Sequence, residues 1–146
     1  MKLYLLEETR FLDELKSSEL NEEQFRLILF YYCKEYQEIF YHDWLEDAIE
    51  VLEERIIGKT DDLEELLEDA KDEVYPYMFE TFSFSKVSEV VMYLLENKSL
   101  SKEILIEKIE DVLYPIEMNS EAGFMEDEDK KLCKILSMVK ANKKVN

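Results

Sequence analysis

Glycine and proline are so scarce in this chain that they restrict its fold more than any other feature of the sequence. Only two glycines and two prolines occur among 146 residues. An all-β chain needs turn residues roughly every 8–12 positions, and this sequence does not contain enough of them. The hydrophobic fraction of 47% is still sufficient for a folded core. We therefore predict an all-α fold, a single-domain helical bundle over residues 1–146 with about six or seven helices.

The stretch 21–58 is expected to organise this bundle, since it holds eight aromatic residues between Phe25 and Trp44. Asn21 and Gln24 have the spacing of a capping box and predict a helix start. A break is expected near His42-Asp43, because Asp43 is a good N-cap and one unbroken helix would be unusually long.

The first helix of this stretch has apolar residues on two opposite sides. One side contains Phe25, Ile28, Leu29, Tyr32, Cys33, Tyr36, Ile39 and Phe40, and the other contains Leu27, Phe30, Tyr31 and Tyr41. Two interpretations follow. Either the helix is central and covered on both sides, or one side faces the core and the other is available to a partner.

Caps and turn residues predict the other helices. The first should cover residues 3–17, and Gly58 should follow the helix that starts at Asp43. Thr60 should cap the next helix, and either Ser83 or Ser85 should cap one that ends near Asn97.

A further helix is expected to start after Ser101, followed by a loop over 116–128 and a last helix over 127–141. Two tyrosine–proline pairs, Tyr75-Pro76 and Tyr114-Pro115, are expected to stop the helices before them. Their similar surroundings suggest a duplicated helix–Tyr-Pro–helix hairpin, although chance similarity between acidic helices explains them as well.

The charge of the chain excludes several classes of function. The formal net charge is −18, which opposes binding to nucleic acid and to anionic lipid surfaces. No run is long enough to span a membrane. The remaining candidates are a basic protein partner, a cation, or no partner.

The acids are concentrated in one region. Residues 43–73 contain fourteen acids and three basic residues, whereas residues 130–146 contain six lysines and no acid. Solvated helix surfaces and helix dipoles explain part of this pattern. They do not require so many like-charged pairs, which destabilise a helix. A negative surface that attracts a basic protein, or that imitates nucleic-acid phosphates, is the functional interpretation.

The sequence offers little for catalysis. His42 is the only histidine, and no phosphate-binding glycine loop or histidine-based metal motif occurs. Residues 126–129 are acidic but lack the pattern of a calcium loop. Cys33 and Cys133 are expected to be buried free thiols, and together with the acidic N-terminus they favour a cytoplasmic location. We therefore expect no catalytic residue, no metal and no cofactor, although carboxylates paired in space would not be visible in the sequence.

In type, the chain resembles immunity proteins of bacterial toxin systems and phage anti-defence inhibitors. The resemblance rests on small size, acidity and helical composition alone. It implies binding and neutralisation or regulation of a basic partner such as a toxin, a nuclease or another nucleic-acid-binding protein. The alternative is an adaptor module that forms a homodimer through the second aromatic helix face. The charge pattern and helix periodicity predict partner contacts at Glu46, Glu50, Glu53, Glu54, Asp61, Asp62, Glu65 and Asp69, with Phe30, Tyr31 and Tyr41 as aromatic anchors.

Overall fold

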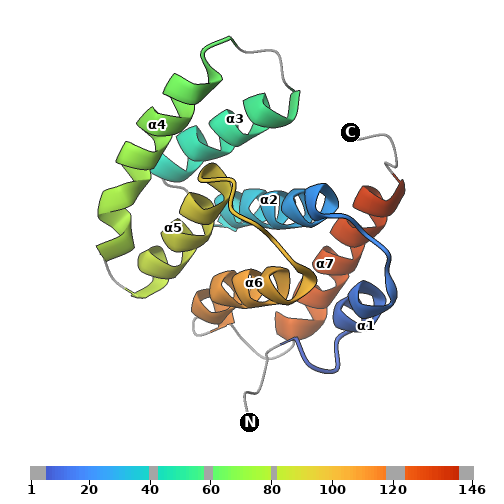
Figure 1. Cartoon of the computed structure of the whole chain (residues 1–146). Coiled ribbons are helices and arrows are strands. Elements are labelled where there is room, and N and C mark those ends of the chain that lie inside the picture. Colours follow the sequence, from blue (N-terminus) through green and yellow to red (C-terminus); the bar gives the residue numbers. More distant parts are fainter. Residues whose placement is uncertain (1–5, 40–42, 58–60, 80–81, 118–123, 142–146) are drawn as a thin grey trace. The chain divides into compact units, whose positions relative to one another are not determined.

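The computed structural model describes residues 6–39, 43–57, 61–79, 82–117 and 124–141. Within these ranges all regular secondary structure is helical, which confirms the all-α prediction. The elements there are α1 (Arg10–Ser17), α2 (Glu22–Ile39), α3 (Asp43–Ile57), α4 (Leu63–Val74), the short 3₁₀ helix η1 (Tyr75–Phe79), α5 (Phe82–Leu95), α6 (Lys102–Glu117) and α7 (Phe124–Ala141) (Figure 1).

Contacts divide the chain into two compact units. Unit 1 comprises residues 1–32 and 99–146, and unit 2 comprises residues 33–98. Helix α2 contributes its first part to unit 1 and its last part to unit 2. A single domain over residues 1–146 stays a prediction.

In unit 2, helices α3 and α4 pack side by side (Figure 1). Helix α5 packs against both of them, and η1 packs against α4 and α5. Trp44, Leu45, Ala48, Ile49 and Leu52 of α3 are buried, as the helical periodicity predicts. Ile56, four positions after Leu52 and so on the same side of the helix, is 41% exposed at its end. In unit 1, α1 packs against α7, with Phe11 and Leu15 buried on α1 and Leu132 and Leu136 buried on α7.

Local hydrogen bonds confirm three predicted helix ends. The Asn21 N–H donates to Gln24 Oε1 and the Gln24 N–H donates to Asn21 Oδ1, both at 2.9 Å, so the capping box forms. Ser101 Oγ accepts from the Ile104 N–H at 3.2 Å and caps α6. Asn97 has φ 54°, and the Asn97 and Lys98 N–H groups donate back to Leu94 and Tyr93. This is a Schellman motif, which ends α5 near Asn97 as expected.

Other boundaries differ from the prediction. Helix α1 begins at Arg10, so residues 6–9 of the predicted range 3–17 are not helical, and residues 3–5 lie outside the described residues. Thr9 caps α1 by accepting from the Leu12 N–H at 3.2 Å. Glu8 precedes this cap with φ 70°, a left-handed conformation that a helix does not continue through.

The predicted caps of α4 and α5 and the predicted start of α7 need correction. Helix α4 has Asp62 at its N-cap position, whereas Thr60 lies outside the described residues, as does Gly58. Helix α5 begins at Phe82, before either predicted serine cap. Helix α7 begins at Phe124, three residues earlier than expected, with acids in its first turn that suit the helix dipole. The described part of the stretch 21–58 contains two helices, α2 and α3, as predicted. Asp43 is the first residue of α3, and His42 lies outside the described residues.

The two tyrosine–proline pairs have different local structures. Helix α4 ends at Val74 as predicted, but Tyr75 keeps helical angles (φ −50°, ψ −46°) and the chain continues as η1. The prediction that Tyr114-Pro115 stops a helix is wrong, because α6 continues to Glu117. Near the end of a helix a proline forfeits only one backbone hydrogen bond, a loss that packing can offset. The predicted loop over 116–128 is correspondingly shortened at both ends, and the duplicated hairpin stays a prediction.

Candidate functional site

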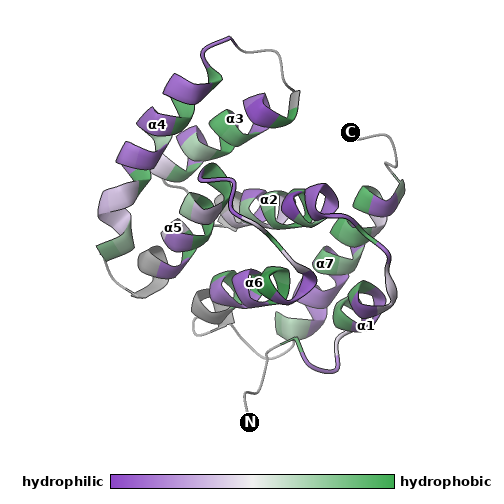
Figure 2. Ribbon diagram, in the orientation of Figure 1, coloured by the Kyte–Doolittle hydropathy of each residue, from purple (hydrophilic) through white to green (hydrophobic). Residues whose placement is uncertain are grey.

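The predicted partner contacts lie mainly on α3, on α4 and in the turn before α4. We call the eight carboxylates Glu46, Glu50, Glu53, Glu54, Asp61, Asp62, Glu65 and Asp69 the acidic face. Of these, Glu50 on α3, Asp61 and Asp62 in the turn, and Glu65 and Asp69 on α4 are exposed. The other three are half-buried. Figure 2 shows hydrophilic residues along α4, on a helix whose buried side includes Ala70 and Val74.

Three basic residues near the acidic face, Arg55, Lys34 and Lys71, bind other groups of the same chain. Arg55 donates to the carbonyl oxygens of Leu94 and Leu95 at 2.5 and 2.6 Å, so its guanidinium caps the end of α5. Lys34 pairs with Glu53 at 2.6 Å and Lys71 pairs with Glu68 at 2.9 Å. Among the described residues of α3 and α4, acids therefore greatly outnumber cations, and negative potential persists at the surface.

The predicted aromatic anchors are in a different situation. Phe30 is only 4% exposed and Leu27 only 7%, so the second side of α2 is covered at these positions. Phe30 therefore needs correction as a surface anchor, because its ring is removed from solvent. Tyr31 is half-buried and contacts Phe30 edge-on, with ring centroids 5.3 Å apart. Tyr41 lies outside the described residues.

Three carboxylates lie close together in a cluster: Glu73 near the end of α4, and Asp43 and Asp47 near the start of α3. Glu73 hydrogen-bonds to Asp47, and Asp43 lies close enough to act on it electrostatically. Partial burial, this hydrogen bond and the two neighbouring charges all raise the pKa of Glu73. Negative charge is therefore costly where these carboxyl groups lie close together.

Sequence reasoning missed a pair of exposed aromatic side chains beside this cluster. Tyr75 is 56% exposed and Phe79 is 73% exposed, at the two ends of η1. Their rings contact each other edge-on, with centroids 5.2 Å apart. The signal was present in the sequence as an aromatic-rich segment after α4, but no periodicity indicated which of its rings face solvent.

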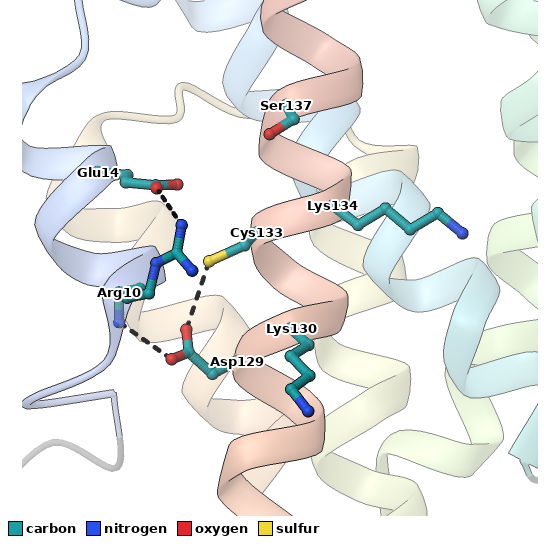
Figure 3. Close-up of a pocket in the computed structure, with 7 residues that line it drawn as sticks. All are labelled: Arg10, Glu14, Asp129, Lys130, Cys133, Lys134 and Ser137. Carbon is teal, nitrogen blue, oxygen red and sulfur yellow. Dashed lines mark hydrogen bonds and ion pairs between the residues drawn. The ribbon is translucent and has the colours of Figure 1, made fainter.

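In unit 1, an open pocket of about 310 Å³ lies between α1 and α7 (Figure 3). It is lined by Arg10, Glu14, Asp129, Lys130, Cys133, Lys134 and Ser137. Asp129 accepts from the backbone N–H groups of Arg10 and Phe11 at 3.0 and 2.9 Å. A carboxylate of α7 therefore satisfies the free amides at the start of α1.

Neither cysteine is ionised near neutral pH. The Cys133 thiol donates to Asp129 at 3.5 Å, and burial together with the Asp129 charge raises its pKa to about 11. Complete burial raises the pKa of Cys33 to about 12. Cys33 is buried as predicted, whereas Cys133 is only half-buried. Because the thiolate is the reactive form, neither side chain is activated as a nucleophile.

In the acidic run at residues 126–129, Glu128 and Asp129 bind other groups of the chain. Glu128 is 4% exposed, accepts from the Tyr32 hydroxyl at 2.7 Å and pairs with Lys131 at 2.9 Å. Asp129 caps α1. In the described part of the chain, no three His, Cys, Asp or Glu side chains are grouped so that they could hold a metal ion. None of its helices combines the length and apolar character needed to cross a membrane.

Comparison of this chain with protein families, with curated proteins and with solved structures finds no match.

Proposed function

We propose that this protein is a non-catalytic binding protein that holds a basic protein against the acidic face of α3 and α4 and thereby neutralises or regulates it. One observation carries the proposal. Five of the eight carboxylates of this face are exposed, in a region where the described basic side chains are engaged by α5, Glu53 or Glu68. Such a surface attracts cationic partners over several ångströms and orients them before contact.

Three properties of the partner follow from this proposal. It is basic, and its binding weakens as salt rises. Suitable classes are a toxin, a nuclease or another nucleic-acid-binding protein. A row of carboxylates can imitate the nucleic-acid phosphates that the surface of such a partner binds. The protein itself binds no nucleic acid, no lipid surface, no metal and no cofactor in this proposal. It acts where free thiols persist, which favours the cytoplasm.

The alternative, a homodimer through the second aromatic side of α2, is not favoured by any described contact. Leu27 and Phe30, two residues of that side, are buried.

The test uses the triple variant Glu50→Gln, Glu65→Gln, Asp69→Asn, because all three side chains are exposed and the changes keep their size. The matched control is Glu103→Gln, Glu107→Gln, Glu126→Gln, which removes three exposed charges from α6 and α7. Proteins retained from lysate at about 0.1 M salt are identified by mass spectrometry and then purified for titration.

We expect basic proteins to be retained and their affinity to fall by about threefold or more in the acidic-face variant, since three exposed ion pairs contribute about 0.2–1 kcal/mol each. The control should change affinity less than about twofold. Equal losses in the two variants would show that net charge alone matters, and unchanged binding in both would overturn the proposal.

A further inference from the structure

The aromatic pair Tyr75 and Phe79 is the most exposed apolar feature of the described chain. Large apolar side chains that stay in water forfeit the free energy of burial, roughly 1.5–3 kcal/mol for a fully buried ring. Single exposed rings are common on protein surfaces, but here two adjacent rings contact each other at 5.2 Å. They lie at the two ends of a short 3₁₀ helix, and more than half of each side chain is exposed.

The pair is held in place by contacts below it. Tyr77, between the two exposed residues, stacks on Trp44 of α3 with ring centroids 5.1 Å apart and an interplanar angle of 23°. Trp44 is 2% exposed, so this stack anchors η1 to the first turn of α3. The aromatic pair therefore projects from a fixed platform, and a partner would not have to order it on binding.

Carboxylates are close to this platform along the chain. Glu73 is two residues before Tyr75 and hydrogen-bonds to Asp47, while Asp43 directly precedes Trp44. The last turn of α4 holds two acids, Asp72 and Glu73, and one cation, Lys71, so its net negative charge opposes the helix dipole, which favours cations there. A cation from outside the chain would reduce both the repulsion between these carboxylates and their unfavourable interaction with the dipole of α4.

We propose that the aromatic pair and the Asp43, Asp47 and Glu73 carboxylates form an arginine-binding site, which receives an arginine side chain of the basic partner. This inference rests on the proposed function and assigns the position of its central contact. Guanidinium groups stack on aromatic faces and pair with carboxylates through two parallel hydrogen bonds. A lysine ammonium has the same charge but neither the planar face nor the fork of donors, so this site distinguishes the two cations.

The test uses two fluorescently labelled peptides of equal length and charge, one with arginine and the other with lysine at every basic position. Anisotropy titration of the full chain at about 50 mM salt measures both affinities. The variant is Tyr75→Ser with Phe79→Ser, and the matched control is Met138→Ser, which removes a 45% exposed apolar side chain from α7.

We expect the wild-type chain to bind the arginine peptide about two- to fivefold more tightly than the lysine peptide. The double serine variant should lose this preference and keep its affinity for the lysine peptide, and Met138→Ser should change neither. If the serine variant fails to fold, Tyr75→Leu with Phe79→Leu keeps the apolar surface without a ring and should lose the preference equally.

An unchanged arginine preference in these variants would overturn the inference. So would a homodimer, seen by sedimentation, that the serine variant abolishes, because the pair would then be a self-association surface. If both peptides bind equally and the acidic-face variant weakens both, the proposed function survives and only this site is wrong. If neither peptide binds, the proposed function fails as well.

Discussion

At the scale of the residue, neighbouring acids affect the pKa of Glu73. The pKa of its carboxyl is raised by partial desolvation, by a side-chain hydrogen bond with Asp47 and by the charges of Asp47 and Asp43. A group with a raised folded-state pKa favours the folded state most at low pH, and this advantage is lost as pH rises through the folded pKa. At neutral pH the Asp47–Glu73 contact is therefore destabilising.

Glu73→Gln is expected to stabilise the fold at pH 7, because an amide donates to Asp47 without needing a proton. The free energy of unfolding should rise by about 0.2–1 kcal/mol, and the gain should vanish as pH falls to that of an unperturbed glutamate. Urea denaturation at several pH values measures this. Glu64→Gln, an exposed change on the same helix, is the control. A gain that is independent of pH would contradict the raised pKa of Glu73.

At the scale of the helix, ends are determined by side chains close in sequence. Asn21 and Gln24 exchange hydrogen bonds at the start of α2, and Ser101 caps α6. These bonds span three residues, so the sequence alone was enough to predict them. Asp129 also caps a helix, but from 119 positions away along the chain, and its role at α1 could not be predicted from any local pattern.

The capping box gives a direct test at this scale. Asn21→Ala should lower the free energy of unfolding by about 1 kcal/mol, because the Gln24 amide at the exposed helix start loses its acceptor. Asn21→Ser keeps an acceptor at the cap and should cost only a few tenths of a kcal/mol. Chemical denaturation compares both variants with the wild type. Equal losses would show that the side-chain oxygen is not what stabilises this end.

The whole chain carries a net charge of −18, which places like charges close together in the folded state and less so in the expanded unfolded chain. Added salt screens this repulsion within a Debye length of about 10 Å at 0.1 M. The acidity therefore lowers the free energy of unfolding. Binding of a basic partner would reduce this repulsion and so stabilise the fold.

We expect the melting temperature to rise by a few degrees between about 0.01 and 0.5 M sodium chloride, since 1 kcal/mol corresponds to about 2–4 °C for a chain of this size. Differential scanning calorimetry measures the rise. It should be smaller in the Glu50→Gln, Glu65→Gln, Asp69→Asn variant, which has fewer repelling charges. A melting temperature that falls with salt would mean that ion pairs such as Lys34–Glu53 outweigh the repulsion.

Composition and local spacing were sufficient for the helical class, for most helix positions and for the acidic character of α3 and α4. The physical reason is that helix formation depends on hydrogen bonds and side-chain periodicity within about four residues. They were insufficient wherever one helix meets another. The covering of Phe30, the outward position of Phe79, the engagement of Arg55 by α5 and the pairing of Glu73 with Asp47 all depend on which helix faces come together. Packing between elements sets those contacts, and no local pattern in the chain encodes it.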